Sequence, residues 1–403
     1  MSGPRPTWTS SRPEGPEALD AFARVMGESF GGDAQQHQGW IQRIGADGIR
    51  IARTAAEPCV GGLGVLPFGM WIGGRAVSCT GISAVAVAPH VRGTGLAKAL
   101  VRDALLEAHR EGVALSGLYP ATLSVYRGVG FGQAGLRVQT RVPISTLGAL
   151  SQGQRALPVR RVLPSDHAAV EALYERVASR HDGWLRRNAY IWSRVNRPPR
   201  GAVAECYLIG PEDGPPEGHL GIQRVMRPDS LFHDLLLTDV SLETPRAIER
   251  FWSFLAAHGS LAEDALLPLD PSDAVLGLLP EPTFRATVRD AWMLRLVDLD
   301  AAFTQRGWRP GARGTLEFEL DDPLITANGG RWRLQVEDGS ARLEPGGSGA
   351  LRIDMPGLSS LYSGFRDVRS LVQLGRADVR DPAVIEQAQA LFSGPTFHMP
   401  DHF

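Results

Sequence analysis

The chain has 403 residues, 43% of them hydrophobic, and a formal net charge of −2. This length and composition indicate a globular protein of two to four domains with buried cores. No apolar run approaches the roughly 20 residues that span a bilayer. The near-neutral charge gives no general attraction to nucleic acid or anionic membranes. Because the first residues also lack an apolar signal segment, we expect a cytoplasmic protein with no nucleic acid partner and no membrane insertion.

Cysteine and histidine usage gives no sign of a metal site. The three cysteines (Cys59, Cys79 and Cys206) are scattered, and their odd number argues against a disulfide framework. The ten histidines show no metal-binding spacing, so we expect no metal. Basic residues are nearly all arginine, and Lys98 is the only lysine.

A first module is expected over residues 1–150. A helix is predicted over 16–30, because apolar residues recur on one face and two glycines follow. We then expect three strands, a helix ending at Gly112, a strand, a short helix and a last strand. The strands are predicted over 48–53, 59–66, 75–87, 113–118 and 136–142, and the short helix carries Tyr126.

The most informative segment joins the third strand to the helix after it. The strand ends in Val85, Ala86 and Val87 and is broken by Pro89. The turn and the first helical residues are Arg92, Gly93, Thr94, Gly95, Leu96, Ala97 and Lys98. Glycines let backbone N–H groups approach an anion, and a helix N-terminus favours negative charge. The segment therefore predicts a cradle for the pyrophosphate of a nucleotide-linked cofactor.

Other phosphate-binding loops fit this segment less well. A Walker loop needs Gly-Lys-Ser/Thr, but Lys98 lies beyond the glycines with no Ser or Thr after it. A dinucleotide fingerprint needs three spaced glycines and a later acidic residue, and Glu111 lies near a helix end. What remains is Arg-x-x-Gly-x-Ala after Val-x-Val-x-Pro, filled by Arg92, Gly95 and Ala97. This pattern resembles the coenzyme A motif of the GCN5-related N-acetyltransferases.

A second module, residues 151–281, repeats this topology without the motif. Ser165 is predicted to cap a helix through Val177. A hairpin follows over 202–209 and 219–226, and then a strand over 234–242 and a helix over 245–258. The turn from Ser241 to Thr244 has no glycine, and Glu243 would repel a pyrophosphate. We therefore expect a degenerate acetyltransferase-like domain that binds no cofactor.

A third module, residues 282–403, differs in kind. Strands are predicted over 288–297, 314–320, 331–337 and 341–344, and helices near 356–365 and 382–392. This layout resembles a sterol carrier protein-like domain. The expected fold class is α+β, with two acetyltransferase-like modules of mixed sheet and flanking helices, followed by a sterol carrier protein-like α/β domain.

The whole chain resembles the enhanced-intracellular-survival (Eis) N-acetyltransferases. The resemblance rests on the coenzyme A motif, on Tyr126 before Gly130-Phe131, and on an end in Asp401-His402-Phe403. It implies acetyl-CoA as the donor, amine acceptors such as aminoglycosides, lysine side chains or polyamines, and a homo-oligomer, namely a hexamer. By position, it implies cofactor contacts at Val85, Ala86, Val87, at Arg92 to Lys98, and at Ala121 and Thr122. It implies a catalytic pair of Tyr126 and the α-carboxylate of Phe403.

The chemistry of amine acetylation suits these groups. The leaving thiolate needs a proton, and a tyrosine has a pKa near 10, above the roughly 8.5 of a thiol. A terminal carboxylate, with a pKa near 3.5, is a weak base. We therefore expect Phe403 to order a water and hold the ammonium rather than to remove its proton outright. Apolar residues before it (Phe397, Met399 and Pro400) favour docking of the chain end.

Two other functions remain open from the sequence. The third module alone is consistent with a lipid or sterol carrier, provided that the helix bearing Leu358 and Leu361 lines a cavity. The motif also indicates binding of coenzyme A and does not identify the acyl chain that the coenzyme carries. An acyltransferase that uses another acyl-CoA, or an arylamine acceptor, is therefore the other alternative.

Overall fold

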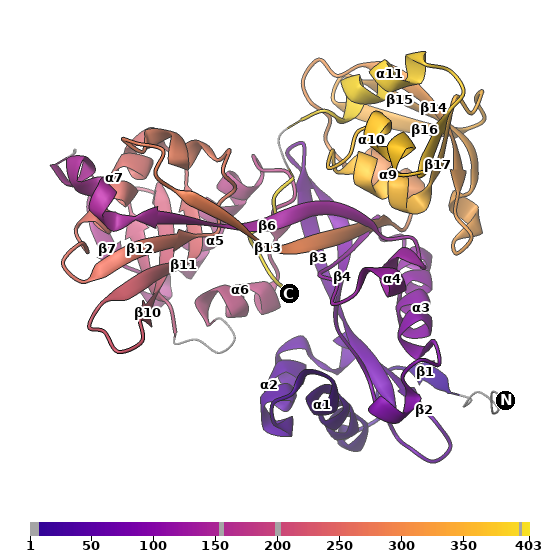
Figure 1. Ribbon diagram of the computed structural model, residues 1–403, viewed down its shortest axis with the longest axis horizontal. Helices are drawn as coiled ribbons and strands as arrows, with labels where there is room; N and C mark the ends of the chain where they lie inside the picture. Colours follow the sequence, from indigo (N-terminus) through magenta and orange to yellow (C-terminus); the bar gives the residue numbers. More distant parts are fainter. Residues whose placement is uncertain (1–7, 153–156, 198–202, 395–396) are drawn as a thin grey trace. The chain divides into compact units, whose positions relative to one another are not determined.

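The computed structural model describes residues 8–152, 157–197, 203–394 and 397–403. The chain divides into two compact units, whose elements are labelled in Figure 1. Unit 1 comprises Met1–Gly135, Trp292–Thr396 and Phe403, and unit 2 comprises Leu136–Ala291 and Phe397–His402.

Unit 1 contains a mixed sheet in the order β1-β2-β3-β4-β5, followed by the part of β13 from Trp292 on. Neighbouring strands are antiparallel except β4 and β5, which are parallel and therefore need a crossover, which helix α3 supplies. The strands are β1 (Thr9–Ser11), β2 (Ile49–Arg53), β3 (Gly61–Ile72), β4 (Arg75–Val87), β5 (Leu115–Leu118) and β13 (Arg285–Leu296). The helices are α1 (Pro16–Phe30), α2 (Ala34–Ile44), α3 (Leu96–Arg110) and α4 (Leu123–Arg127).

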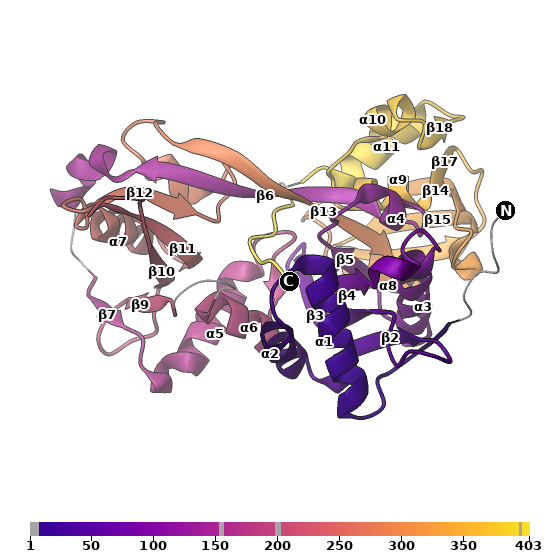
Figure 2. The ribbon, with the colours of Figure 1, turned by 60° about the horizontal axis from the view of Figure 1, so that its bottom comes forward.

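Glycines of β3 let helices close on both faces of this sheet. A Cβ on Gly61 would lie 3.0 Å from Leu96 of α3, and one on Gly62 would lie 2.7 Å from Phe22 of α1. Because successive residues of a strand point to opposite faces, α1 and α3 cover different faces of β3, as Figure 2 also shows. β4 ends at Val87, and the turn that follows it leads into α3.

Strand β13 departs from the layout expected from the sequence. We predicted a strand over 288–297 among those of the third module, but β13 pairs with β5, with Met293 opposite Leu118. Its residues Trp292, Met293 and Leu294 are fully buried. An apolar strand of this kind fits the interior of either sheet, so its partner cannot be read from the pattern.

A second sheet of unit 1 has the order β16-β15-β14-β17-β18. Its strands are β14 (Gly314–Asp321), β15 (Gly330–Glu337), β16 (Ser340–Pro345), β17 (Leu351–Asp354) and β18 (Ala377–Val379). The helices of this part are α8 (Leu299–Gln305), α9 (Met355–Tyr362), α10 (Val368–Gln373) and α11 (Ala383–Phe392). Leu358 and Leu361 of α9 are buried, and the ring of Tyr362 packs 5.6 Å from that of Phe303. The apolar face of α9 is therefore part of a packed core.

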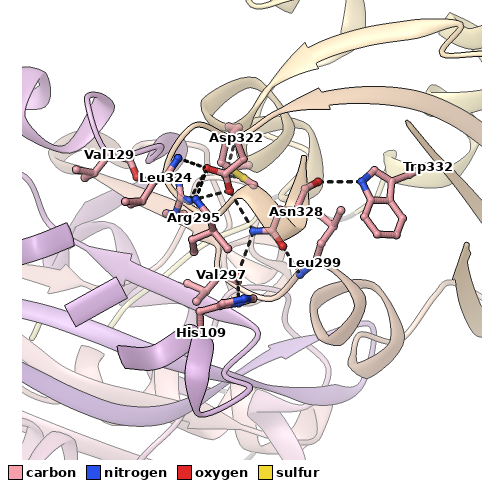
Figure 3. A network of polar contacts seen from close by, with 12 residues as sticks. His109, Val129, Arg295, Val297, Leu299, Asp322, Leu324, Asn328 and Trp332 are labelled. Atoms are coloured by element: carbon pink, nitrogen blue, oxygen red, sulfur yellow. Dashed lines mark hydrogen bonds and ion pairs between the residues drawn. The ribbon is translucent and has the colours of Figure 1, made fainter. Parts of the chain in front are cut away.

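A buried polar network joins β13 to the part of unit 1 after it (Figure 3). Arg295, whose side chain is 1% exposed, donates to both carboxylate oxygens of Asp322 and to the carbonyl of Val129. Asn328 donates to the same carboxylate and to Val297 O. Gly130 has φ +93°, and a Cβ there would overlap the Arg295 guanidinium. Gly130, four residues after Tyr126, thus leaves room for the side chain of the buried Arg295.

Unit 2 repeats the arrangement of the first module. Its sheet runs β6-β12-β11-β10-β9-β7, with β11 and β12 parallel and joined by α7. The strands are β6 (Gly132–Pro143), β7 (Val159–Arg161), β8 (Leu185–Arg186), β9 (Glu205–Ile209), β10 (Gly218–Met226), β11 (His233–Leu242) and β12 (Ala262–Leu267). The helices are α5 (His167–Ala178), α6 (Ala189–Asn196) and α7 (Pro245–Ala256). One apolar core includes Leu220, Leu235 and Phe251.

The predicted cap of the first helix in this module is wrong. We expected Ser165 to cap it, but α5 begins at His167 after a short 3₁₀ turn, Pro164–Asp166. The carboxylate of Asp166 accepts from the Leu163 N–H at 2.7 Å and pairs with Arg160. Asp166 is the N-cap residue of α5, but its side chain makes no bond to the helix, because the carboxylate is turned back to Leu163 and Arg160. Of the predicted hairpin strand over 202–209, residue 202 lies outside the described residues.

Candidate functional site

The parallel strands β4 and β5 part at their carboxyl ends. They pair only from Cys79 opposite Leu115 to Ile82 opposite Leu118. β5 ends there, while β4 continues to Val87 alongside β3. The last five residues of β4 therefore extend beyond β5, and their edge on that side is open to an extended ligand. Binding at such a point is typical of parallel strand ends.

A β-bulge lies in this extension of β4. The pairing with β3 passes from Gly64–Ser83 to Gly62–Ala86, so two residues of β4 face one of β3. Ala84, within the bulge, has φ +50°, a conformation that costs a non-glycine residue free energy. Bulges re-aim backbone groups next to functional sites. The predicted residues Val85, Ala86 and Val87 follow directly, and Val87 O accepts from Ser29 Oγ and Arg92 Nε.

The turn before α3 leaves its backbone amides accessible. Gly93 and Gly95 have φ +80° and +92°, and nothing lies within 4 Å of where a Cβ would stand on either. The N-cap residue of α3, Gly95, has no side chain to fill the helix end, and Ala99 donates back to Gly95 O. Thr94 turns its hydroxyl to Val91 O. No side chain therefore caps the first amides of α3, which lie at the end of the helix dipole that favours an anion.

Lys98 and the segment 121–127 lie on the same side of unit 1. The ammonium of Lys98 would be 3.2 Å from a Cβ on Gly128, directly after α4. Thr122 is the N-cap residue of α4, and its hydroxyl lies 3.3 Å from Ser124 Oγ. Ala121 and Thr122 are both exposed. The structure thus places α3 and α4 side by side. Ala121 and Thr122, just before α4, remain exposed to solvent.

Tyr126 is largely buried on α4. Its side chain is 7% exposed and lies edge-on to Phe131 with ring centroids 6.2 Å apart. The carbonyl of Tyr126 accepts from Phe131 N–H, which closes the turn after the helix. Burial raises the pKa of Tyr126 above its usual value. The phenol therefore stays protonated at neutral pH, where it is a hydrogen-bond and proton donor.

Phe403 packs where β4 and β5 are still paired. Its ring lies 4.9 Å from that of Phe68 and 5.5 Å from that of Tyr119. Gly81 and Gly117 are register partners, and a Cβ on Gly81 would approach the Phe403 ring to 2.8 Å. The last side chain of the protein is thus 5% exposed and covers two glycines at the point where the strands part.

Sequence reasoning missed four of these residues. Phe68, Tyr119, Gly81 and Gly117 surround the Phe403 ring, yet none belongs to the coenzyme A motif. The glycines carried a usable signal, because isolated glycines in otherwise apolar strands mark close approach of another group. The two aromatic residues carried none, since aromatic residues are common in strands.

Two negative observations apply to the described residues only. Residues 8–152, 157–197, 203–394 and 397–403 include no group of three or more His, Cys, Asp or Glu side chains that could hold a metal ion. Within the same ranges, no helix is both long and apolar enough to cross a bilayer.

Comparison with protein-family models matches three parts of the chain. An acetyltransferase (GNAT) domain matches residues 11–134 and another matches residues 183–296. A sterol carrier protein domain matches residues 299–400. These matches confirm the predicted fold class of two acetyltransferase-like modules followed by a sterol carrier protein-like domain.

Known relatives match over nearly the whole length. N-acetyltransferase Eis of Mycobacterium tuberculosis is 27% identical, covering 88% of this chain and 89% of the relative. The crystal structure of a GCN5-related N-acetyltransferase from Anabaena variabilis is 30% identical, with a TM-score of 0.91 over 98% of this chain and 100% of that one. A GCN5-related N-acetyltransferase from Kribbella flavida is 27% identical, with a TM-score of 0.84 over 99% of both chains.

Matches of this extent define an N-acetyltransferase of the GCN5-related class. The chain belongs to this class and is a homologue of the Eis N-acetyltransferases, so it is an acetyltransferase enzyme. The fold implies acetyl-CoA as its co-substrate. The residues present fit that molecule, because the Gly93–Gly95 turn offers free space and uncapped amides for a pyrophosphate.

Proposed function

We propose that this enzyme transfers the acetyl group of acetyl-CoA directly to a primary amine in a ternary complex. The turn from Arg92 to Lys98 holds the pyrophosphate, and the extension Val85–Val87 pairs with the amides of the pantetheine arm. Ala121 and Thr122 make further contacts to the cofactor. The single observation that carries the proposal is the open end of α3 beside the unpaired extension of β4. Together they offer an anion cradle followed by an extended edge.

Tyr126 is the general acid in this proposal. The amine nitrogen forms a bond to the acetyl carbon, the carbon–sulfur bond breaks, and the thiolate takes a proton from the phenol. Support comes from burial, which raises the pKa of Tyr126 and keeps it protonated at neutral pH. An N–H of the Val85–Val87 segment stabilises the oxygen that becomes negative during attack. The contact of α3 with Gly128 supports a place for α4 near the cofactor.

The carboxylate of Phe403 orients the acceptor. It holds the ammonium and an ordered water. Because a terminal carboxyl with its low reference pKa is too weak a base to remove the proton outright, the ammonium loses one proton to solvent and the small neutral fraction of the amine attacks. The proton that the nitrogen loses after attack passes through the ordered water to the Tyr126 phenolate. Support comes from the Phe403 ring, which is 5% exposed and packs against Phe68 and Tyr119 where β4 and β5 part. A chain end without a role is normally frayed and exposed.

Aminoglycosides, lysine side chains and polyamines are the proposed acceptor classes, and a hexamer is the proposed assembly. These follow the family resemblance of the chain. A thiol-release assay with acetyl-CoA and representatives of the three classes tests the acceptors. Light scattering coupled to size-exclusion chromatography tests the assembly. A lipid-carrier role finds no support in α9, because Leu358 and Leu361 are core residues.

The catalytic pair is tested by three variants in steady-state assays. Tyr126→Phe removes only the phenolic hydroxyl, so we expect unchanged affinity for acetyl-CoA and a kcat about 10²–10⁴-fold lower. One glycine added after Phe403 moves the carboxylate by up to about 3.5 Å, and deletion of Phe403 leaves the terminal carboxylate on His402 and removes the Phe403 ring. Both chain-end changes are expected to reduce turnover strongly while cofactor binding persists.

Each variant needs a check of thermal unfolding and of acetyl-CoA binding by calorimetry. A glycine extension that turns over at the native rate would remove Phe403 from the mechanism. An unchanged kcat in Tyr126→Phe would make Tyr126 a core residue and assign the acid elsewhere. Loss of cofactor binding in any of the three variants would mean that the changed residue, Tyr126 or Phe403, supports the cofactor site and not the chemical step.

A further inference from the structure

Unit 2 contains a cavity that the proposed acetyl transfer does not use. Its volume is about 300 Å³, and it lies between α5, α6 and the strands β9 and β10. This size is at the lower end of the range of small-molecule sites. The walls are apolar and aromatic, and include Val162, Val170, Trp192 and Ala204.

One buried polar side chain lines this cavity without a well-directed hydrogen bond. His219 of β10 is 1% exposed, and its Nδ1 lies 3.3 Å from Oδ2 of Asp239. The atom that lacks a well-directed bond is Nδ1, and it faces Asp239. A carboxylate beside Nδ1 favours the tautomer with the proton on that atom. The other nitrogen, Nε2, is then an acceptor available to a bound ligand.

The charges behind His219 favour a cationic ligand. Asp239 shares the single guanidinium of Arg187 with a second carboxylate, Asp401, and all three side chains are at most 3% exposed. Burial opposes ionisation of Asp239, but the adjacent Arg187 and His219 outweigh it and hold the pKa of Asp239 below its usual range. The single positive charge of Arg187 is thus shared by two carboxylates. His219 contacts one of them, Asp239, and is itself part of the cavity lining.

The remaining polar groups of the lining are a carboxylate, a thiol, an amide and a second, exposed imidazole, that of His167. Glu171 is exposed and adds a carboxylate to the lining. Burial raises the pKa of Cys206 to about 11, so the thiol is neutral, and it lies 3.8 Å from Asn196 Oδ1. Among the described lining residues there is no arginine or lysine.

We propose that this cavity binds a small organic ammonium ion with an apolar, ring-sized body. The ring lies against Trp192 and Ala204, and the ammonium donates to His219 Nε2, with Asp239 behind the imidazole. The Arg187 guanidinium already lies 4.7 Å from the Trp192 ring centroid, so Trp192 offers the ring of the ligand its remaining apolar surface. The second module then keeps a ligand site although its strand-to-helix turn has no cradle for coenzyme A.

Phenethylamine is a suitable probe, because it does not absorb at 295 nm, where tryptophan fluorescence is excited. We expect a saturable change in fluorescence of the full chain without acetyl-CoA, and its loss in Trp192→Phe, where calorimetry still detects binding. A charge-assisted hydrogen bond is worth about 1.5–3 kcal/mol, so 2-phenylethanol should bind roughly 10-fold more weakly or worse. The anion 3-phenylpropionate should not bind.

Two variants test the location. Ala204→Leu fills the cavity and should abolish binding without affecting acetyl transfer, whose proposed residues lie in unit 1. His219→Gln removes the imidazole and should weaken binding about 10-fold, whereas His258→Gln, the same change outside the cavity lining, should not. Thermal unfolding checks each fold. The proposal fails if phenethylamine does not saturate, if Ala204→Leu binds normally, or if the carboxylate binds more tightly than the amine.

Discussion

The two acetyltransferase-like modules share a topology but use the same turn in opposite ways. In both, an antiparallel strand pair leads through a helix to a parallel neighbour: β4–α3–β5 in one and β11–α7–β12 in the other. At the start of α3, Gly95 has no side chain to cap the first amides. At the start of α7, Thr244 accepts from Ala247 N–H, so its own side chain fills the helix end.

The charge of the second turn is also engaged within the protein. Glu243 accepts from Arg176 at 2.8–3.0 Å and from Arg180 at 3.1 Å. Thr244 donates its hydroxyl to Glu217, which also pairs with Arg246. A helix N-terminus can satisfy its orphan amides with a ligand or with itself. The comparison teaches that the first module leaves its helix start uncapped, as the proposed anion site requires, while the second caps it with its own side chain.

The largest effect on the second module should come from its buried ion cluster. In Arg187→Met, the two buried carboxylates Asp239 and Asp401 lose the guanidinium that bonds to both. Breaking a buried pair costs about 3–5 kcal/mol, and we expect this loss in the unfolding free energy measured by chemical denaturation. Arg194→Met, at a partly exposed arginine of the same unit, should cost far less. Equal losses would mean that the cluster is not specially important.

The next largest effect should separate binding from stability in the first module. Gly95→Asp places a carboxylate in the cradle and should abolish acetyl-CoA binding, about 100-fold or more in affinity, by like-charge repulsion. Because Asp tolerates the left-handed conformation, thermal unfolding should change little. Gly95→Asn has the same shape without the charge and should bind better than the Asp variant. Calorimetry that finds two sites in the native chain would contradict the assignment of one cradle.

The matching change in the second turn should have the reverse effect. Thr244→Ala removes the side-chain cap of α7, and we expect a loss of about 1 kcal/mol in unfolding free energy. Acetyl-CoA affinity should not change, because this turn holds no cofactor. Thr244→Ser retains the capping oxygen and should be close to native. A weaker affinity in Thr244→Ala, at unchanged stability, would show that the second turn also binds cofactor.

The smallest effect should depend on pH. Arg176 lowers the pKa of Glu243, so the ion pair stabilises the fold above the usual pKa of a glutamate and is lost as the pH falls through the lower folded pKa. Glu243→Gln should therefore cost at most about 1 kcal/mol at pH 7, because Arg176 and Arg180 are partly exposed. The difference from the native chain should shrink in acid. A difference that persists at pH 3 would come from packing and not from charge.

Local patterns predicted much of the fold, including the glycine turn before α3. The bounds of α1 and β4 agree with the structure at both ends, because proline, glycine and apolar spacing mark them in the chain itself. The turn at Gly93 and Gly95 was visible for the same reason. Such features need no knowledge of distant residues.

Features that depend on distant partners were not predictable. The strand that pairs with β13 is determined by the sheet around it, not by the residues of β13. The bulge at Ala84 has a positive φ without a glycine, so the sequence gives no sign of it. Arg187 and Arg295 look like any other surface arginine in the sequence, yet both are buried with carboxylates far along the chain. The closeness of Phe403 to Gly81 and Gly117 was beyond reach for the same reason.

The single lysine of the chain gives this enzyme an unusual analytical property. Lys98 is exposed on the cofactor helix, beside Gly128. An amine-reactive reagent can therefore modify one side chain in 403 residues, in addition to the N-terminal amine. A fluorophore or an isotope label attached there would report directly on the first turn of α3, without any engineered cysteine. Protection of this one amine by coenzyme A could be followed by mass spectrometry on the native protein.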